Sequence, residues 1–174
     1  MVFNLTSKEL NGFTVLAQSL RQPLITKDHI SLLYPGSGDR LEHALKIVEI
    51  FCGKPEKVNI HLVDPMLSPA VLEKKVVGLD HVEVHVFQEN FQIGHIPENL
   101  TIYFERAFDI FREDWMIDAV VKKLVPGGLF VSDAPINHPH LKPLPVPPGA
   151  KDIGFYPWFG VYQKDSLQPD QRKV

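Results

Sequence analysis

The sequence of 174 residues predicts an α/β fold, with one doubly wound, mostly parallel sheet and helices on both faces. Two observations predict it. Short apolar segments alternate with longer amphipathic ones up to about Pro135, and glycine or proline turns separate them. Five apolar segments are expected to be strands, at residues 29–34, 58–63, 82–87, 100–104 and 129–132. Four amphipathic segments are expected to be helices, at residues 7–20, 39–51, 68–77 and 112–124.

The first helix and the strand, turn and helix that follow it have clear local signals. Thr6 and Ser7 are good N-caps for the first helix, and Pro23 stops it. The first strand ends in the turn Pro-Gly-Ser-Gly at residues 35–38. The next helix ends at Gly53 and carries an apolar stripe at helical spacing. The residues of this stripe are Leu41, Ala44, Leu45, Val48 and Phe51.

The later elements follow the same rules. Pro69 suits the first turn of the third helix, which Ser68 caps. The third strand alternates valine with Glu83 and His85, which predicts that one of its faces is exposed. Pro-Gly-Gly at residues 126–128 ends the last helix and turns the chain into the fifth strand.

Proline is concentrated after the fifth strand. Six of the 15 prolines lie between residues 135 and 148, which predicts a stiff polyproline II strap that borders the substrate crevice. Pro157 excludes a central strand and favours an aromatic edge strand near the C-terminus. We therefore expect a single domain over residues 1–174. Its parts are an N-terminal helical segment (1–28), a core (29–133), the strap (134–153), the edge strand (154–164) and a tail (165–174).

Composition excludes several classes of protein. The net charge of −3 disfavours a nucleic-acid partner. The single cysteine, Cys52, excludes an intramolecular disulfide and a multi-cysteine zinc site. No apolar run is long enough to span a membrane, and the first residues lack a secretory signal. We expect a cytoplasmic protein with no membrane partner.

Two features point to a ligand site at the carboxyl ends of the first two strands. Gly36 and Gly38 allow a close approach of the backbone, and the helix after them offers free N–H groups. Asp64 follows the second strand, where a carboxylate can accept hydrogen bonds from both hydroxyls of a ribose. Together they predict a ligand that contains a nucleoside.

Other constellations offer weaker alternatives. Asp133, His138 and His140 lie close in sequence and could act as a base or bind a metal, but solvated loop residues are the simpler interpretation, so no metal site is predicted. A nicotinamide-dependent enzyme would need a third glycine where Leu41 stands. No hydrolase elbow, Walker loop or zinc-protease motif occurs.

From about Ile30 to Asp133 the sequence resembles the class I S-adenosylmethionine-dependent methyltransferases, with their Rossmann-like fold. Four segments carry the resemblance: residues 32–38 at the first glycine motif, 61–65 at the second-strand acid, 87–90 after the third strand and 124–131 before the fifth. The run Leu-Val-Pro-Gly-Gly-Leu-Phe-Val at 124–131 is the most specific match.

The resemblance implies S-adenosylmethionine as cofactor and assigns roles to particular residues. Asp64 would hold the ribose, Gln88 and Glu89 would flank the adenine, and Glu105 and Arg106 would face the site of methyl transfer. The glycine motif would also contact the cofactor, through Tyr34, Gly36, Ser37 and Gly38. A small-molecule or protein acceptor and a homodimer are further expectations.

Two positions depart from the family pattern. Tyr34 stands where the family usually has an acid, and Arg40 stands at the third glycine position. Arg40 could pair with the carboxylate of the cofactor or fill its pocket. The sequence therefore leaves two functions open. One is methyl transfer, and the other is a non-catalytic binding or scaffolding domain of the same fold that has lost cofactor binding.

Overall fold

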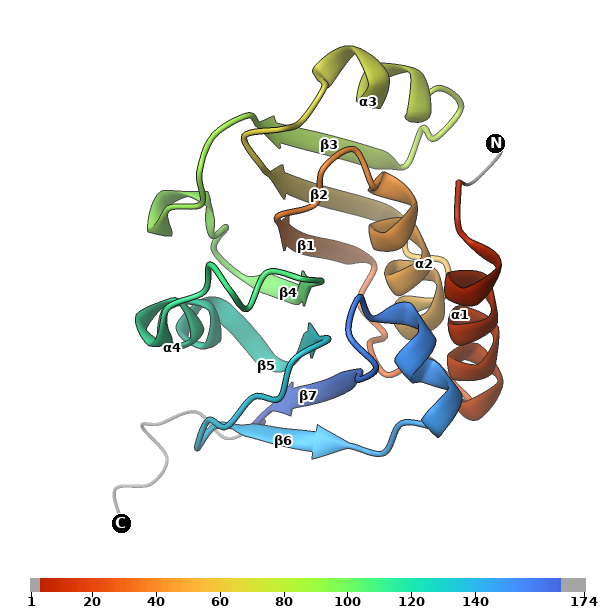
Figure 1. The fold of residues 1–174 in the computed structure, drawn as a ribbon, viewed down its shortest axis with the longest axis vertical. Helices are drawn as coiled ribbons and strands as arrows, with labels where there is room; N and C mark the ends of the chain where they lie inside the picture. Colours follow the sequence, from red (N-terminus) through yellow and green to blue (C-terminus); the bar gives the residue numbers. More distant parts are fainter. Residues whose placement is uncertain (1–3, 167–174) are drawn as a thin grey trace.

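The computed structural model describes residues 4–166 and contains one seven-stranded sheet (Figure 1). The strand order is β3-β2-β1-β4-β5-β7-β6. Strands β1 to β5 are parallel, whereas β7 is antiparallel to both of its neighbours. The strands are β1 (His29–Pro35), β2 (Lys57–Val63), β3 (Val82–Phe87), β4 (Leu100–Glu105), β5 (Leu124–Ser132), β6 (Leu141–Leu144) and β7 (Gly160–Lys164). The predicted α/β fold with a mostly parallel sheet is confirmed.

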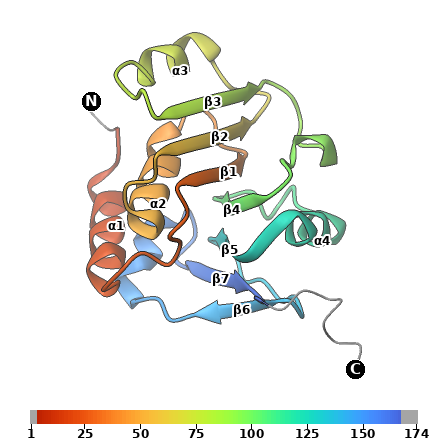
Figure 2. The same cartoon turned by 180° about the vertical axis from the view of Figure 1, so that it is seen from behind.

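Helices lie on both sides of the sheet, as predicted. Helices α1 and α2 and the 3₁₀ helix η2 lie on one side and α4 lies on the other, while α3 lies beside the β3 edge (Figures 1 and 2). The helices are α1 (Ser7–Ser19), α2 (Leu41–Cys52), α3 (Pro69–Lys75), α4 (Asp114–Lys123), η1 (Ile93–His95) and η2 (Pro148–Ile153). Thr6 caps α1 in a reciprocal arrangement with Glu9. Among residues 4–166, no helix combines the length and apolar character needed to cross a bilayer.

Alternate residues of the central strands face two apolar layers. Ile102 and Phe104 of β4 pack toward α1 and α2, and Tyr103 between them packs toward α4. The β2–β3 end of the sheet has polar side chains on the α4 side, since the connection from β3 to β4 contains only the short η1. His61 and His85 stack there with ring centroids 4.5 Å apart, and burial lowers the pKa of His61 to about 4.

The C-terminal third differs from the expected strap and edge strand. Part of the proline-rich segment forms β6, and the predicted edge strand begins only at Gly160, as β7. Strand β7 is not an edge strand, because it pairs with β5 on one side and with β6 on the other. Pro143 is accommodated because β6 itself is the edge, where a missing N–H costs no ladder hydrogen bond. Residues 167–174 of the predicted tail lie outside the described residues.

The predicted turn at Pro126–Gly128 lies inside β5, which begins five residues earlier than expected. The pairing register between β4 and β5 shifts there, between Leu100 and Ile102. A Cβ on Gly128 would lie 2.9 Å from the Val125 carbonyl oxygen and 3.0 Å from that of Thr101. A side chain at residue 128 would collide with both oxygens. Glycine avoids this collision and lets β5 continue through the irregularity.

Close packing of α1 on η2 gives a test of the fold. A Cβ on Gly12 would lie 2.7 Å from the Ile153 amide nitrogen. We expect Gly12→Ala to lower the free energy of unfolding by about 1–3 kcal/mol, because the backbone of η2 must move. Alanine is otherwise the better helix former, by about 1 kcal/mol. Gly94→Ala is the control, since no atom lies within 4 Å of its Cβ position. Urea denaturation measures the free energies of unfolding. A Gly12→Ala protein as stable as the wild type would contradict the close contact.

Candidate functional site

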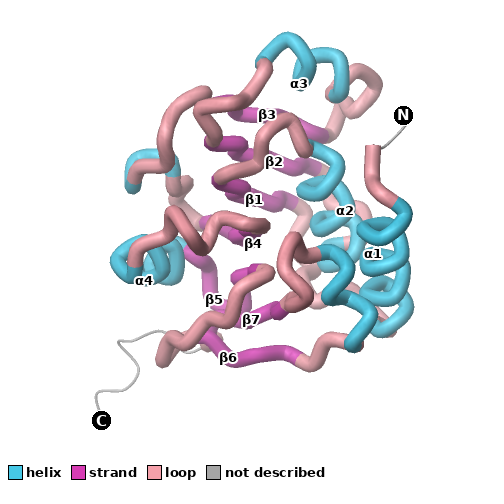
Figure 3. Tube along the Cα trace, viewed as in Figure 1, coloured by secondary structure: helices cyan, strands magenta, loops and turns pink. Residues whose placement is uncertain are grey.

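A cleft of about 530 Å³ lies at the carboxyl ends of β1 and β2, and its lining residues come from the glycine turn after β1 and from the segments that follow β2, β3 and β4. Figure 3 shows these connecting segments as loops at one end of the sheet. This is the edge at which open parallel sheets bind ligands. Seven of its ten lining residues carry apolar side chains, and one carries a charge. The lining residues are Gly36, Val63, Asp64, Pro65, Met66, Asn90, Phe91, Phe108, Phe111 and Met116. The cleft therefore combines two of the predicted site residues, Gly36 and Asp64, with an apolar surround.

Asp64 holds the glycine turn against the end of β2. One carboxylate oxygen accepts a hydrogen bond from the Gly38 amide at 2.8 Å, and the other accepts one from the Met66 amide at 2.7 Å. Gly36 and Gly38 both have positive φ, at 62° and 51°. A carboxylate has about four lone-pair positions, so each oxygen of Asp64 retains room for a second donor. Its structural role leaves it able to accept a ligand hydroxyl.

Phe108 covers Gly36. A Cβ at Gly36 would lie 2.9 Å from the Phe108 ring, so a larger residue would displace the ring. The chain turns sharply before Phe108, because Ala107 has a φ of 55° and its amide donates to both carboxylate oxygens of Asp133 at 3.0 Å. The Gly36 backbone therefore meets an aromatic side chain of its own protein at the floor of the cleft.

Tyr34 and Ser37 do not line the cleft. The Tyr34 side chain is buried in the core, with its hydroxyl 3.0 Å from Nδ1 of His43, and burial raises the pKa of Tyr34. Burial also lowers the pKa of His43, to about 4, and the negative charge of Glu9 opposes that shift. The Ser37 hydroxyl donates to the Gly38 carbonyl. Both residues shape the turn from within.

The predicted adenine-flanking pair is exposed beside the cleft. Gln88 and Glu89 are exposed, and one carboxylate oxygen of Glu89 lies 2.5 Å from Nε2 of His95. Neither residue lines the cleft, but the next two residues, Asn90 and Phe91, do. The segment 87–90 that carries the resemblance therefore reaches the cleft through Asn90, and a contact of Gln88 and Glu89 with an adenine stays a prediction.

Glu105 does not face the cleft, contrary to expectation. Its side chain is fully buried and accepts hydrogen bonds from Nε of Arg112 at 2.9 and 3.0 Å. The hydroxyls of Tyr103 and Ser132 donate to it at 2.8 and 2.7 Å. Burial raises the pKa of Glu105, and the Arg112 charge opposes that shift. This carboxylate is held by the core of the protein.

Arg106 also points away from the cleft, toward α1. Its Nη2 lies 2.9 Å from a carboxylate oxygen of Glu9, and its Nε donates to the Ile153 carbonyl at 3.0 Å. Arg40, the predicted departure in the glycine motif, also binds Glu9, through Nη1 at 3.2 Å, and stays half exposed. Burial alone would raise the pKa of Glu9. The Thr6 amide, His43 and the two arginines outweigh burial and hold this pKa below its ordinary value.

Sequence reasoning missed half of the ten residues that line the cleft. Met66, Phe91, Phe108, Phe111 and Met116 were not predicted, whereas Asn90 lies in the segment 87–90 that carried the resemblance. The rule that ligands bind beyond the carboxyl ends of parallel strands would have found the loops after β2, β3 and β4. The positive φ of Ala107 carries no such signal, because alanine seldom adopts it.

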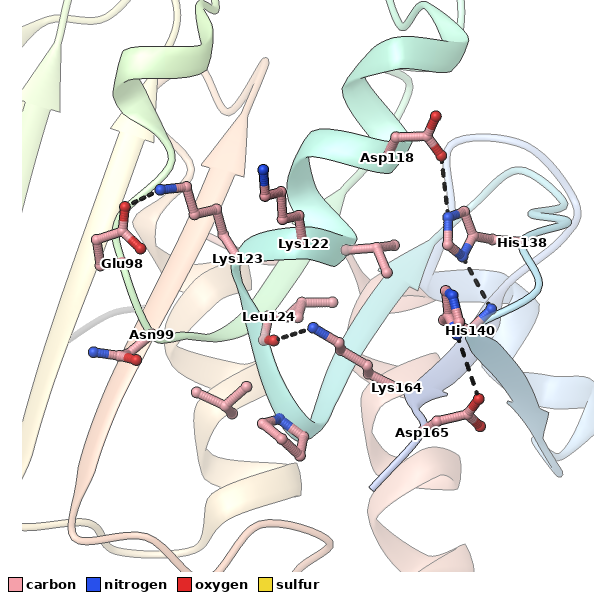
Figure 4. A pocket seen from close by; sticks show the side chains of 13 residues that line it. Glu98, Asn99, Asp118, Lys122, Lys123, Leu124, His138, His140, Lys164 and Asp165 are labelled. Atoms are coloured by element: carbon pink, nitrogen blue, oxygen red, sulfur yellow. Dashed lines mark hydrogen bonds and ion pairs between the residues drawn. The ribbon is translucent and has the colours of Figure 1, made fainter. Parts of the chain in front are cut away.

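A second cavity, of about 480 Å³, lies at the opposite end of β4 and β5 (Figure 4). His138 and His140, considered above as metal ligands, are here close to Asp118 at 3.1 Å and Asp165 at 3.7 Å. Asp133 lies elsewhere, with the Ala107 and Phe155 amides. Within residues 4–166 no three side chains of the metal-binding types are grouped to hold an ion.

The Glu9 cluster predicts a pH-dependent stability. Glu9→Gln removes the negative charge beside two arginines, and we expect it to cost about 3 kcal/mol of unfolding free energy. Because the folded pKa of Glu9 is lowered, this stabilisation is present above pH 4.5 and is lost as the pH falls through the folded pKa. Glu49→Gln, at an exposed ion pair with Lys46, should cost less than about 1 kcal/mol. If Glu9→Gln lowers the free energy of unfolding by the same amount at pH 3 as at pH 7, the stabilisation does not come from the charge of Glu9.

The buried pair of Glu105 and Arg112 predicts a strong coupling. Arg112→Met leaves the Glu105 carboxylate buried without its cation and should cost about 3–5 kcal/mol. The double variant with Glu105→Gln should recover at least half of that loss, because no charge is then left unpaired. Chemical denaturation of the wild type, Arg112→Met, Glu105→Gln and the double variant measures the coupling free energy. Additive losses would show that the two side chains act independently.

No protein-family model matches the sequence, and no curated protein matches it. Solved structures do match. A methyltransferase from Geobacter sulfurreducens aligns with a TM-score of 0.56 and 12% identity, over 95% of this chain and 81% of that one. A SAM-dependent methyltransferase from Aquifex aeolicus aligns with a TM-score of 0.52 and 18% sequence identity, over 90% of each chain. An rRNA methylase from Streptococcus thermophilus aligns with a TM-score of 0.52 and 11% sequence identity, over 90% of this chain and 94% of that one. The chain thus has the Rossmann-like fold of the class I S-adenosylmethionine-dependent methyltransferases.

Proposed function

We propose that the chain binds S-adenosylmethionine in the cleft and transfers its methyl group to a small-molecule or protein acceptor. The observation that carries the proposal is the convergence of Asp64, Asn90 and an apolar surround in one cleft of about 530 Å³ at the carboxyl ends of β1 and β2. Ligand sites of this fold type lie at that edge. The solved methyltransferases that share the fold support the class of reaction.

The lining residues suit the adenosyl part of the cofactor. Asp64 has lone pairs left for the ribose hydroxyls after its two backbone hydrogen bonds. The Asn90 amide offers both a donor and an acceptor to a base edge, beside the Phe91 ring and the Met66 thioether. These apolar groups would contact the faces of a planar adenine. Gln88 and Glu89 would then border the base from the solvent side.

The methionine part would lie toward the N-terminus of α2. Arg40 is the N-cap residue of α2, is half exposed and binds Glu9 through one terminal nitrogen. We assign it to the cofactor's carboxylate, which the helix terminus also attracts. Arg106 is more completely enclosed by Glu9 and the Ile153 carbonyl, so we give it no contact with the cofactor.

Methyl transfer makes modest demands on the protein. The cofactor would supply a methyl group on a positively charged sulfur. The lone pair of an acceptor would bond to the methyl carbon in line with the C–S bond, whose electron pair would leave with the sulfur as the neutral thioether of S-adenosylhomocysteine. The chain must therefore hold the two reactants in line and exclude water. A base is needed only where the acceptor has to lose a proton, and Asp64, the charged side chain that lines the cleft, is assigned here to the ribose. The burial of Glu105 thus removes a predicted catalytic residue without removing a required step.

A non-catalytic domain of the same fold is the second candidate, and two observations favour it. Phe108 covers Gly36, and Glu9 neutralises the arginines near the glycine turn. A protein that had lost the cofactor could fill its site with these side chains. The two candidates differ in whether the cleft binds an adenosyl ligand at all.

Calorimetric titration with S-adenosylhomocysteine distinguishes the candidates. We expect micromolar binding, and we expect Asp64→Asn to weaken it about tenfold or more because a charged acceptor of the ribose hydroxyls is lost. Asp39→Asn is the matched control. Asp39 also accepts a backbone hydrogen bond in this region, from Ser68 at 2.6 Å, but it does not line the cleft. No heat at millimolar ligand would favour the non-catalytic domain.

A further inference from the structure

The cleft has two walls of different chemistry. One wall comes from the ends of β1 to β3. It contains the polar side chains of the cleft, the Asp64 carboxylate and the Asn90 amide. The other wall comes from the segment after β4 and the first turn of α4, and its lining residues are Phe108, Phe111 and Met116. This aromatic wall is continuous, since the ring centroids of Phe108 and Phe111 are 6.2 Å apart. Phe91 meets the Phe108 ring edge-on, at 6.0 Å and 82°.

The charged side chains of the same segment do not reach the cleft. Residues 106–113 contain four charged residues, and none of the four lines it. Arg106 is bound to Glu9 and Arg112 to Glu105, with 16% and 10% of their side-chain surfaces exposed. The aromatic wall is therefore apolar although its sequence is highly charged. A charged acceptor placed against it would lose hydration and gain no partner.

Exposed apolar side chains extend the aromatic wall toward solvent. Phe111 is 66% exposed and Ile110 is 69% exposed, and Trp115 beside them is 40% exposed. On the opposite side of the cleft Met66 is 82% exposed. Large apolar groups gathered around a cleft mark a binding surface. Rings and thioethers of this kind bind the face or edge of another aromatic ring.

We infer that the methyl acceptor is a flat, uncharged aromatic small molecule that binds against the aromatic wall of Phe108, Phe111 and Met116. The inference rests on the proposed function, in which the adenosyl group takes the wall of Asp64 and Asn90. We favour a small molecule over a second copy of the chain, because the exposed apolar surface continues into a cleft of about 530 Å³, a volume typical of small-molecule sites. It also excludes phosphate-bearing acceptors, for which the wall has no free cation.

Methionine methyl groups report on the two walls separately. The chain has three methionines, and Met66 and Met116 lie on opposite walls. In protein labelled with ¹³C at the methionine methyl groups, Met66→Leu and Met116→Leu assign the two signals. S-adenosylhomocysteine should shift the Met66 signal. With that ligand saturating, 2-naphthol should shift the Met116 signal, and 2-naphthoate, which has the same ring with a negative charge, should bind at least about tenfold more weakly.

Phe111→Ser provides the matched variant. It removes an exposed ring, so the fold is retained, and it should weaken 2-naphthol about tenfold while changing S-adenosylhomocysteine affinity less than about twofold. Phe155→Ser is the control, because Phe155 is 62% exposed and does not line the cleft. It should leave both affinities unchanged.

Four results would overturn the inference. Loss of 2-naphthol binding when S-adenosylhomocysteine is added would place the ring in the cofactor's own space. Equal binding of 2-naphthoate would show that charge is not discriminated. A fall in molar mass on Phe111→Ser, by light scattering, would assign the exposed rings to an interface between two copies. Binding of 2-naphthol without any response to S-adenosylhomocysteine would overturn the proposed function as well, whereas the first three results leave that function intact.

Discussion

The ion pair between Glu9 and Arg106, 2.9 Å apart, joins the start of α1 to the segment that follows β4. A buried charge costs several kcal/mol unless it is paired, and the buried Glu9 and the largely enclosed Arg106 meet that requirement for each other. Because Glu9 belongs to the capping box of α1, the same carboxylate caps the N-terminus of the helix and holds Arg106 toward α1, while Arg40 stays half exposed near the ligand edge. Glu105 likewise pairs with Arg112, which lies just before α4, and keeps this cation buried. These internal pairs leave the wall after β4 apolar.

Asp64 acts in a comparable way at the other wall. Its two backbone hydrogen bonds fix the glycine turn to the loop after β2, so the position of α2 and the position of the carboxylate are set together. In contrast to Glu9 and Glu105, it remains at the surface of the cleft. One acid of the ligand edge is therefore available for recognition, while two acids near the edge are used for stability. This division explains how a chain with many charged residues forms an apolar cleft.

Much of the fold could be predicted from the sequence because strand and helix periodicities are local. The five parallel strands, the cap at Thr6 and the half-exposed β3 follow from apolar spacing and capping chemistry. β6 could not be predicted, because Pro143 argues against a strand unless the strand lies at an edge, and that depends on the sheet order. Since β6 takes the edge, β7 becomes an interior strand.

The candidate site could be predicted only in part, because position along a strand does not fix where a side chain is used. Asp64 and Gly36 were placed at the cleft by the end-of-strand rule, and both line it. Glu105 and Arg106 satisfy the same rule, yet their partners lie far away in sequence: Ser132 for Glu105, and Glu9 and Ile153 for Arg106. Phe108 reaches the cleft through the positive φ of Ala107, which the Asp133 carboxylate holds. Such contacts arise from the tertiary fold.

A crystal structure of the protein with S-adenosylhomocysteine would locate the cofactor relative to both walls of the cleft. We expect the ribose hydroxyls within hydrogen-bond distance of Asp64 and the base beside Met66 and Asn90. We also expect Glu9 still bound to Arg106 and the aromatic wall left open to the acceptor. Density for the ligand outside this cleft, or a ligand carboxylate that displaces Glu9 from Arg106, would contradict this arrangement.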